Sequence, residues 1–173
     1  MRAIEAADVT LEPQTVAHAD EMFGVLGDPA IYTFENEPPR SADWLRARFA
    51  KLESRQSADG REQWLNWVVR LRTSELAGYV QATVRADGTA AIAYVFASAH
   101  WGRGLAWQAV RAMIGELVAH YGVTALYAIA KRGNLRSHRL LQRLGFALAG
   151  AELLATHDVE ADEILMWRSV VRA

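Results

Sequence analysis

The stretch Trp101-Gly102-Arg103-Gly104-Leu105-Ala106 decides how this chain is interpreted. It lies between a predicted strand and a predicted helix, and its glycines let the backbone turn sharply and approach a ligand closely. The helix that follows leaves its first N–H groups without intrahelical partners, and the positive end of its dipole faces the loop. Such a terminus binds anions, phosphate above all. The alternative is a plain glycine turn before a helix, since the familiar nucleotide-binding glycine patterns are absent from the sequence.

Upstream of this loop the hydrophobic pattern predicts a strand, two helices and three further strands. Residues 9–13 read as a strand, and Thr15 and Ser41 are placed to cap helices over 16–26 and over the segment that follows Ser41. Apolar residues alternate with polar ones over 65–71, as in a half-buried strand. Asp87-Gly88 predicts a tight turn that joins strands 78–84 and 89–96 into an antiparallel hairpin.

Downstream, a long helix starts at Ala106 and is closed by Gly122, where a C-terminal glycine belongs. A short apolar strand over 125–130 follows. Asn134 then caps a helix that Gly145 closes. Two more strands are predicted near 146–154 and 163–170. The order of elements indicates an α/β domain built around one central sheet.

Composition narrows the class of protein. The chain has 173 residues, a formal net charge of −1 and no cysteine. We expect one domain over residues 1–173, because domains of this size are common. The charge gives no electrostatic case for a nucleic-acid or membrane partner. The lack of cysteine fits a reducing compartment, and no apolar run approaches the roughly 20 residues of a membrane span, so we expect a cytoplasmic protein. The histidines are scattered singly, and we predict no metal site.

The segment from His100 to Val110, HWGRGLAWQAV, resembles the acetyl-CoA loop of the GCN5-related N-acetyltransferases (GNAT). That loop has Gln or Arg, two residues, Gly, one residue, then Gly or Ala. Here Gly104 and Ala106 match, and Trp101 stands at the position of the Gln or Arg. A tryptophan followed by glycine at that position is similar to the branch that acetylates the N-termini of ribosomal proteins. Four further segments resemble family elements in the right order: 76–79 the third strand, 92–95 the fourth strand, and 134–137 with 144–146 the late helix and its end.

The resemblance implies the GNAT fold, a single mixed and mostly antiparallel sheet that splays between its fourth and fifth strands, flanked by about four helices. It implies that the loop holds the CoA pyrophosphate and that the end of the fourth strand pairs with the pantetheine. Asn134 either hydrogen-bonds that arm or only caps its helix. Arg103 and the nearby basic cluster would meet the ribose phosphate, or would only be solvated. The implied acetyl-CoA-binding residues are Val95, Phe96, Trp101, Gly102, Arg103, Gly104, Leu105, Ala106, Asn134 and Ser137.

The resemblance is weakest for catalysis. Three positions that carry polar side chains in many relatives are apolar here, Ala91, Ile129 and Leu141. The remaining match is Ser137, where a serine in one ribosomal-protein branch is proposed to protonate the departing thiolate. Ser137 is therefore the catalytic candidate, and the alternative is a small residue that allows helix and cofactor to approach closely. Tyr94 is a lesser candidate and more simply a core residue with a satisfied hydroxyl.

The missing carboxylate base bears on the acceptor. An α-amino group is already partly neutral at pH 7, whereas a lysine costs about 3 kcal/mol more to deprotonate, which favours an amine of low pKa. The acceptor-site candidates are Glu35, Glu37 and Tyr94, and the loop near His157 and Asp158 would form the opposite wall. The carboxylates would attract a cationic amine, or belong to a solvated acidic loop.

The sequence therefore predicts an N-acetyltransferase that moves the acetyl group of acetyl-CoA directly to a primary amine, either a peptide N-terminus or a small molecule. Its partners would be acetyl-CoA and that amine, and the protein would be a monomer or homodimer. A non-catalytic acyl-CoA-binding sensor is the main alternative, because of the apolar substitutions. A structural domain whose loop holds no cofactor is a third.

Overall fold

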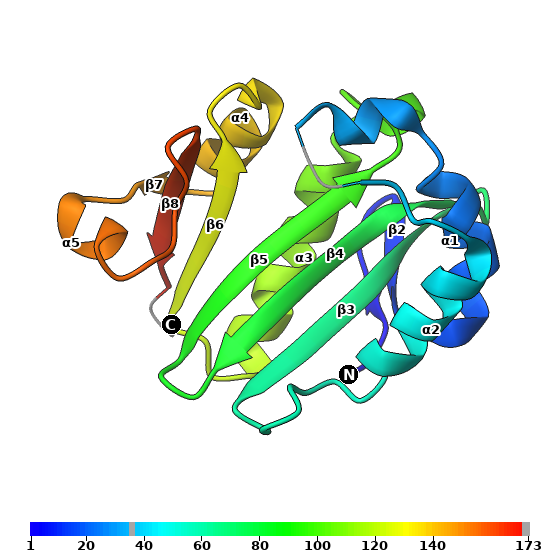
Figure 1. Ribbon diagram of the computed structural model, residues 1–173, viewed down its shortest axis with the longest axis horizontal. Coiled ribbons are helices and arrows are strands. Elements are labelled where there is room, and N and C mark those ends of the chain that lie inside the picture. The colour runs from blue at the N-terminus through cyan, green and yellow to red at the C-terminus, as the bar shows by residue number, and fades with distance from the viewer. Residues whose placement is uncertain (35–36, 171–173) are drawn as a thin grey trace.

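A computed structural model describes residues 1–34 and 37–170, and its centre is one eight-stranded sheet (Figure 1). The strand order is β1-β2-β3-β4-β5-β6-β8-β7. Neighbouring strands are antiparallel except β5 and β6, which are parallel. The strands are β1 Ile4–Glu5, β2 Val9–Pro13, β3 Glu62–Leu71, β4 Leu76–Arg85, β5 Thr89–Phe96, β6 Ala125–Lys131, β7 Ala147–Leu148 and β8 Glu163–Ser169.

Helices cover both faces of the sheet. In Figure 1, α1 and α2 lie in front of the sheet and α3 runs behind β4 and β5, so we call the two sides the α1–α2 face and the α3 face. The α-helices are α1 Ala19–Val25, α2 Ala42–Leu52, α3 Leu105–His120, α4 Leu135–Arg143 and α5 Ala151–Leu154. Short 3-10 helices are η1 Val16–His18, η2 Pro29–Thr33 and η3 Ser98–His100.

The main core lies between the sheet and α3, as the sequence periodicities predict. In β4, Val80, Ala82 and Val84 are buried at period two, and they belong to the same cluster as Met113 and Leu117 of α3. A second cluster lies under α1 and α2, and its buried members are Ala19, Met22, Leu26, Ile31, Leu45, Phe49, Val68 and Leu76. The α3 face is therefore covered along the central strands, whereas the second cluster covers the other face at Val68 of β3 and Leu76 of β4.

Most helix boundaries and turns agree with the predictions. Ser41 Oγ accepts a hydrogen bond from the Trp44 N–H at 3.1 Å and caps α2. Gly122 and Gly145 take the left-handed φ values of 67° and 83° that end α3 and α4. In the β4–β5 hairpin the Gly88 N–H donates to the Arg85 carbonyl at 3.1 Å. The sequence located these turns because each requires a particular residue type.

The strand predicted near 146–154 is present but much shorter than predicted. Only Ala147–Leu148 are strand, and Gly150 precedes α5. Ala, Glu and Leu are strong helix formers, and that local preference decides the structure of 151–154 once the chain leaves β7. Two smaller differences occur near the N-terminus: β1 was not predicted, and the helix predicted over 16–26 consists of η1 followed by α1.

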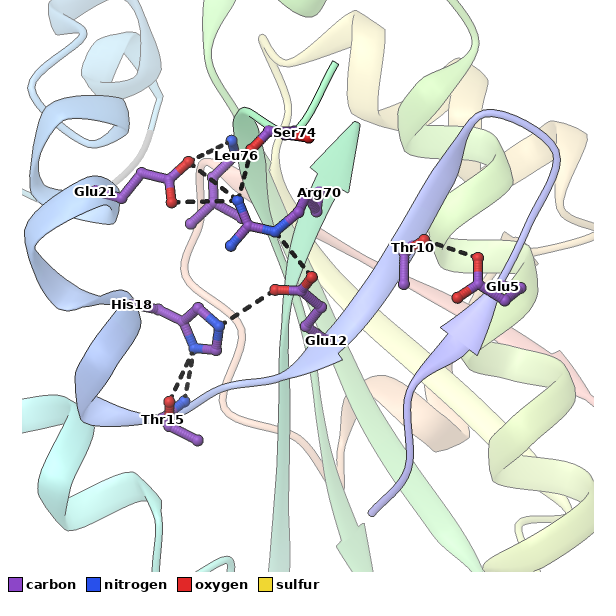
Figure 2. A network of polar contacts seen from close by, with 9 residues as sticks. All are labelled: Glu5, Thr10, Glu12, Thr15, His18, Glu21, Arg70, Ser74 and Leu76. Carbon is purple, nitrogen blue, oxygen red and sulfur yellow. Dashed lines mark hydrogen bonds and ion pairs between the residues drawn. The ribbon is translucent and has the colours of Figure 1, made fainter. Parts of the chain in front are cut away.

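An ion-pair network fastens α1 to the sheet on the α1–α2 face (Figure 2). Arg70 of β3 donates through Nε to Glu12 of β2 at 2.8 Å, and its Nη1 lies 3.2 Å from Glu21 Oε2 of α1. Glu21 also accepts from the Leu76 N–H at 2.8 Å, and His18 Nε2 lies 3.3 Å from Glu12. Burial raises the pKa of Glu12, but the hydrogen bond and charge of Arg70 outweigh it and hold that pKa below its usual range.

Gly78 marks a point where β4 and β5 approach closely. A Cβ placed on Gly78 would lie 2.0 Å from the Val95 carbonyl oxygen and 2.8 Å from Phe96 Cα. Both of these are backbone atoms, so a side chain at position 78 would push the end of β5 away from β4. The end of β5 can therefore lie this close to β4 only because position 78 has no side chain.

We expect Gly78→Ala to lower the free energy of unfolding by about 1–3 kcal/mol, because the methyl group cannot be placed without a backbone shift. The matched control is Gly115→Ala within α3, where a Cβ would meet nothing within 4 Å. That change should raise stability by about 0.5–1 kcal/mol through helix propensity. Urea unfolding of both variants measures this. Equal effects of the two changes would contradict the close approach.

Candidate active site

The glycine loop leads into the N-terminus of α3. Gly102 and Gly104 have φ values of 74° and 77°, a conformation that favours glycine. The Gln108 N–H makes an intrahelical bond to the Gly104 carbonyl at 3.1 Å. The N–H groups of residues 105–107 precede that bond, so by helix geometry they point out of the helix end without intrahelical partners. Leu105 is buried and anchors the loop in the core.

Strands β5 and β6 separate directly beside this loop. They are paired from Thr89 with Ala125 to Ala91 with Tyr127, and Figure 1 shows them diverging beyond that point. On its edge toward β6, the remainder of β5, residues 92–96, thus faces a wedge, while its other edge stays paired with β4. This is the splay predicted between the fourth and fifth strands, which are β5 and β6 once β1 is counted.

The hydrogen-bonding direction alternates along β5. The Ala97 N–H donates to the Ala77 carbonyl of the β4 side at 3.0 Å. By antiparallel alternation the backbone groups of Val95 also face β4, whereas those of Tyr94 and Phe96 face the wedge. The Phe96 carbonyl accepts a hydrogen bond from Trp101 Nε1 at 2.8 Å. The loop tryptophan therefore meets the backbone at the mouth of the wedge.

Two hydroxyl groups meet across the wedge. Tyr94 Oη of β5 lies 2.7 Å from Ser137 Oγ of α4, and either atom can be the donor. The Ser137 N–H donates to Asn134 Oδ1 at 3.2 Å, so Asn134 caps α4 as predicted. Tyr94 is partly buried against the main core. The sequence pointed to both hydroxyl residues separately, and the structure places them in contact.

The basic residues near the wedge differ in their engagement. The Arg136 guanidinium lies over the Trp101 ring, 4.2 Å from its centroid, and Arg103 lies 3.2 Å from His100 Nδ1. Lys131 is within 3.1 Å of Glu160, Asp162 and Glu163, which raise its pKa. Lys131 is thus ion-paired with residues at the start of β8 and just before it, whereas Arg136 lies beside Trp101 at the mouth of the wedge.

The apolar substitutions have structural places. Leu141 of α4 is fully buried in the main core. Ala91 is the last residue of β5 paired with β6, and Ile129 of β6 remains 38% exposed. Within residues 1–34 and 37–170, no group of three or more His, Asp or Glu side chains could hold a metal ion. The hydroxyl pair is thus the polar pair that the structure brings to the wedge.

Residues 28–34, which follow α1, contact the chain after β5 at Ser98 and the chain after β6 at Gly133. Glu35 lies outside the described residues, and Glu37 is exposed. Phe34 contacts the β6–α4 connection so closely that a Cβ on Gly133 would lie 2.9 Å from its Cε1. On the opposite side, His157 packs edge-on against Tyr127 of β6, with ring centroids 4.6 Å apart. No sequence pattern indicates the Phe34 contact, because it joins segments that are distant in the chain.

Asp28 ties this segment to the end of β5. Its Oδ2 accepts from the Ser98 N–H at 2.6 Å, and its Oδ1 accepts from the Ala30 N–H at 3.0 Å. The hydrogen bonds from Ser98 hold the pKa of Asp28 below its ordinary value. A carboxylate with a lowered folded-state pKa stabilises the protein above its unfolded-state pKa, near 4, and loses that contribution as pH falls through the folded value.

We expect Asp28→Asn to lower the free energy of unfolding at pH 7 by about 0.5–1 kcal/mol, since this partly exposed carboxylate loses charge-assisted hydrogen bonds. The difference between parent and variant should shrink as the pH falls from 6 to 3. Urea midpoints across that range provide the measurement. A difference that stays constant with pH would show that the Asp28 charge does not hold the segment.

Comparison with known proteins identifies the family. Residues 8–147 match the family model described as an acetyltransferase (GNAT) domain. The chain therefore belongs to the GCN5-related N-acetyltransferase family. No curated protein matches the sequence. The predicted family and fold are confirmed.

Solved structures share the fold at low identity. RimL, a ribosomal L7/L12 α-N-protein acetyltransferase in complex with coenzyme A, gives a TM-score of 0.79 over 97% of this chain and 98% of its own, at 14% identity. An acetyltransferase from Salmonella typhimurium that modifies the N-terminal serine of ribosomal protein L7/L12 gives 0.78 over 98% and 99%, at 14% identity. The microcin C7 self-immunity acetyltransferase MccE, in complex with acetyl-CoA and AMP, gives 0.72 over 94% and 93%, at 18% identity.

The chain is accordingly an acetyl-CoA-dependent N-acetyltransferase, and the alternative of a non-catalytic acyl-CoA sensor is not supported. Acetyl-CoA is its co-substrate. In the described part of the chain, no helix is both long and apolar enough to cross a membrane.

We expect Gly104→Trp to weaken acetyl-CoA binding at least about tenfold, because the side chain would occupy the space in front of the helix N-terminus. Gly60→Trp is the matched control: Gly60 has a φ of 71°, and a Cβ there also meets nothing within 4 Å, but it lies in the α2–β3 loop. Calorimetry with acetyl-CoA should separate the two variants, with circular dichroism confirming that both fold. Equal affinities of the two variants for acetyl-CoA would show that the glycine loop is not part of the binding site.

Proposed function

We propose that this enzyme transfers acetyl from acetyl-CoA directly to an α-amine, with the thioester bound in the wedge between β5 and β6. The observation that carries the proposal is the contact between Tyr94 and Ser137, 2.7 Å apart at that wedge. The glycine loop would hold the pyrophosphate through its backbone N–H groups. The pantetheine would run along the open part of β5, residues 92–96, with the Asn134 amide as a further donor.

The hydroxyl pair suits the departure of the thiolate. A neutral amine attacks the thioester carbon, the C–S bond breaks, and the sulfur takes up a proton. A serine hydroxyl alone is a weak acid for this step, whereas a phenol has a pKa near 10, close to that of a thiol near 8.5. Ser137 therefore gives its proton to the sulfur and takes one from Tyr94. Water restores the Tyr94 proton, and the proton lost by the amine also goes to water.

The acceptor approaches from the α1–α2 face. Phe34 would stand on one side of it, and the segment around His157 on the other. Positions 91, 129 and 141, which carry polar side chains in many relatives, hold Ala, Ile and Leu here and supply no carboxylate base. This favours an amine that is already partly neutral at pH 7, as an α-amino group is. A peptide N-terminus meets this requirement more readily than a lysine side chain.

We expect Ser137→Ala and Tyr94→Phe each to lower kcat by about 10²-fold with little change in the KM for acetyl-CoA. The double variant should be no slower than the slower single variant, because the two hydroxyls act as one unit. Tyr121→Phe, at the far end of α3, is the control and should leave kcat unchanged.

Release of the CoA thiol with a panel of peptide and small-molecule amines gives these rates. Two independent losses that multiply in the double variant would contradict the relay. A kcat within twofold of the parent for Ser137→Ala would return Ser137 to a packing role.

A further inference from the structure

A polar groove lies on the α1–α2 face, away from the glycine loop. It opens between α2 and the middle of strands β3 and β4. Its lining includes Arg48 and Lys51 from α2, Trp64 and Asn66 from β3, and Gln81 and Thr83 from β4. Leu52 and Ala82 complete the lining, so the floor combines apolar groups with uncharged polar ones, and one wall carries two cations. None of these residues takes part in the transfer step proposed above.

The two cations are not neutralised by described carboxylates. Arg48 stacks on Trp44 at 5.7 Å, and Lys51 Nζ lies 5.9 Å from the centroid of the Trp64 ring. Within residues 1–34 and 37–170, neither makes an ion pair within 4.0 Å. By contrast, Arg46 on the same helix pairs with Asp20 and Asp43.

Glu62 is the carboxylate nearest along β3, and it is already engaged. Its Oε1 lies 3.3 Å from Arg85 Nε, and its Oε2 accepts from Trp64 Nε1 at 3.3 Å. Asn66 lines the groove although only 7% of its surface is exposed. Cations with aromatic and amide neighbours form a suitable site for a carboxylate. The groove therefore favours an anion.

Sheet register connects this groove to the wedge. Asn66 is paired with Gln81, and Gln81 is paired with Ala93 of β5, so the three side chains lie in one row on the same face. Two strand spacings separate Asn66 from Ala93, about 10 Å. Ala93 lies in the open part of β5, and the next residue, Tyr94, points to the α3 face and contacts Ser137. An acceptor whose amine reaches the wedge can therefore extend along this row into the groove.

We propose that the groove binds a carboxylate of the acceptor, and that the acceptor is a peptide with an acidic residue at the third or fourth position. This inference rests on the proposed transfer to an α-amine. An extended peptide advances about 3.3 Å per residue, which matches the row. A free amino acid is too short to span it. A polyamine or an aminoglycoside would be repelled by Arg48 and Lys51.

The test uses pentapeptide amides that begin with serine, are otherwise glycine, and carry one Asp at position 2, 3, 4 or 5, each compared with its Asn counterpart. The parent enzyme should prefer Asp at position 3 or 4 by about five- to tenfold in kcat/KM, as two exposed ion pairs allow, and less at high salt. Arg48→Gln combined with Lys51→Gln should bring the ratio of Asp to Asn peptide close to one.

Arg61→Gln is the matched control, because Arg61 is exposed in the α2–β3 loop and does not line the groove. It removes the same kind of charge and should keep the preference. If Asp and Asn peptides are acetylated equally by the parent, the inference is overturned and the proposed transfer stands. The same holds if the double substitution leaves the preference intact.

Calorimetry with the CoA-bound enzyme separates failure of the groove from failure of the transfer. If the Asp peptide binds more tightly than the Asn peptide but neither is acetylated, the anion site stands and the proposed peptide acetylation fails. If neither peptide binds, or both bind equally, the groove does not recognise a carboxylate and the inference is overturned.

Discussion

The structure depends on the separation of β5 and β6 after their pairing at Ala91 and Tyr127. Strand edges that leave a sheet carry backbone groups that need partners. Here Trp101 bonds the Phe96 carbonyl, and the rest of the edge faces a space closed at the far side by α4. The contact between Tyr94 and Ser137 spans that space. The wedge is thus a place in the sheet where a strand is missing, and a linear cofactor with amide groups would complement it, as we propose for acetyl-CoA.

Much of the fold could be predicted because local chemistry determined it. Glycines with left-handed φ at positions 104, 122 and 145 stand where a loop or helix end needs them, and Ser41 and Asn134 cap the helices that were assigned to them. The loop at the start of α3 could be located from its glycines alone. Its identification as an acetyl-CoA loop required the resemblance to the GNAT family, because glycines before a helix are common.

The parts that could not be predicted depend on contacts between distant segments. Nothing in the local sequence indicates that Phe34 meets Gly133, or that a side chain on Gly78 would strike Val95. The Ala151–Leu154 segment follows its helix propensity instead of extending the sheet. For the same reason the sequence indicates the loop with Glu35 and Glu37 as the acceptor site, because its acidic residues are close together in the chain. The groove lined by Arg48 and Lys51 could not be predicted, because it forms only where α2, β3 and β4 meet in the fold.

Amide hydrogen exchange with and without acetyl-CoA tests the central claim most directly, namely that the cofactor occupies the wedge and caps α3. We expect slower exchange on binding at residues 102–107, at the open part of β5 and at the start of α4. The far strands β1 and β2 should be unaffected. Unchanged exchange at residues 102–107 under saturating acetyl-CoA, or protection confined to another part of the sheet, would contradict the account.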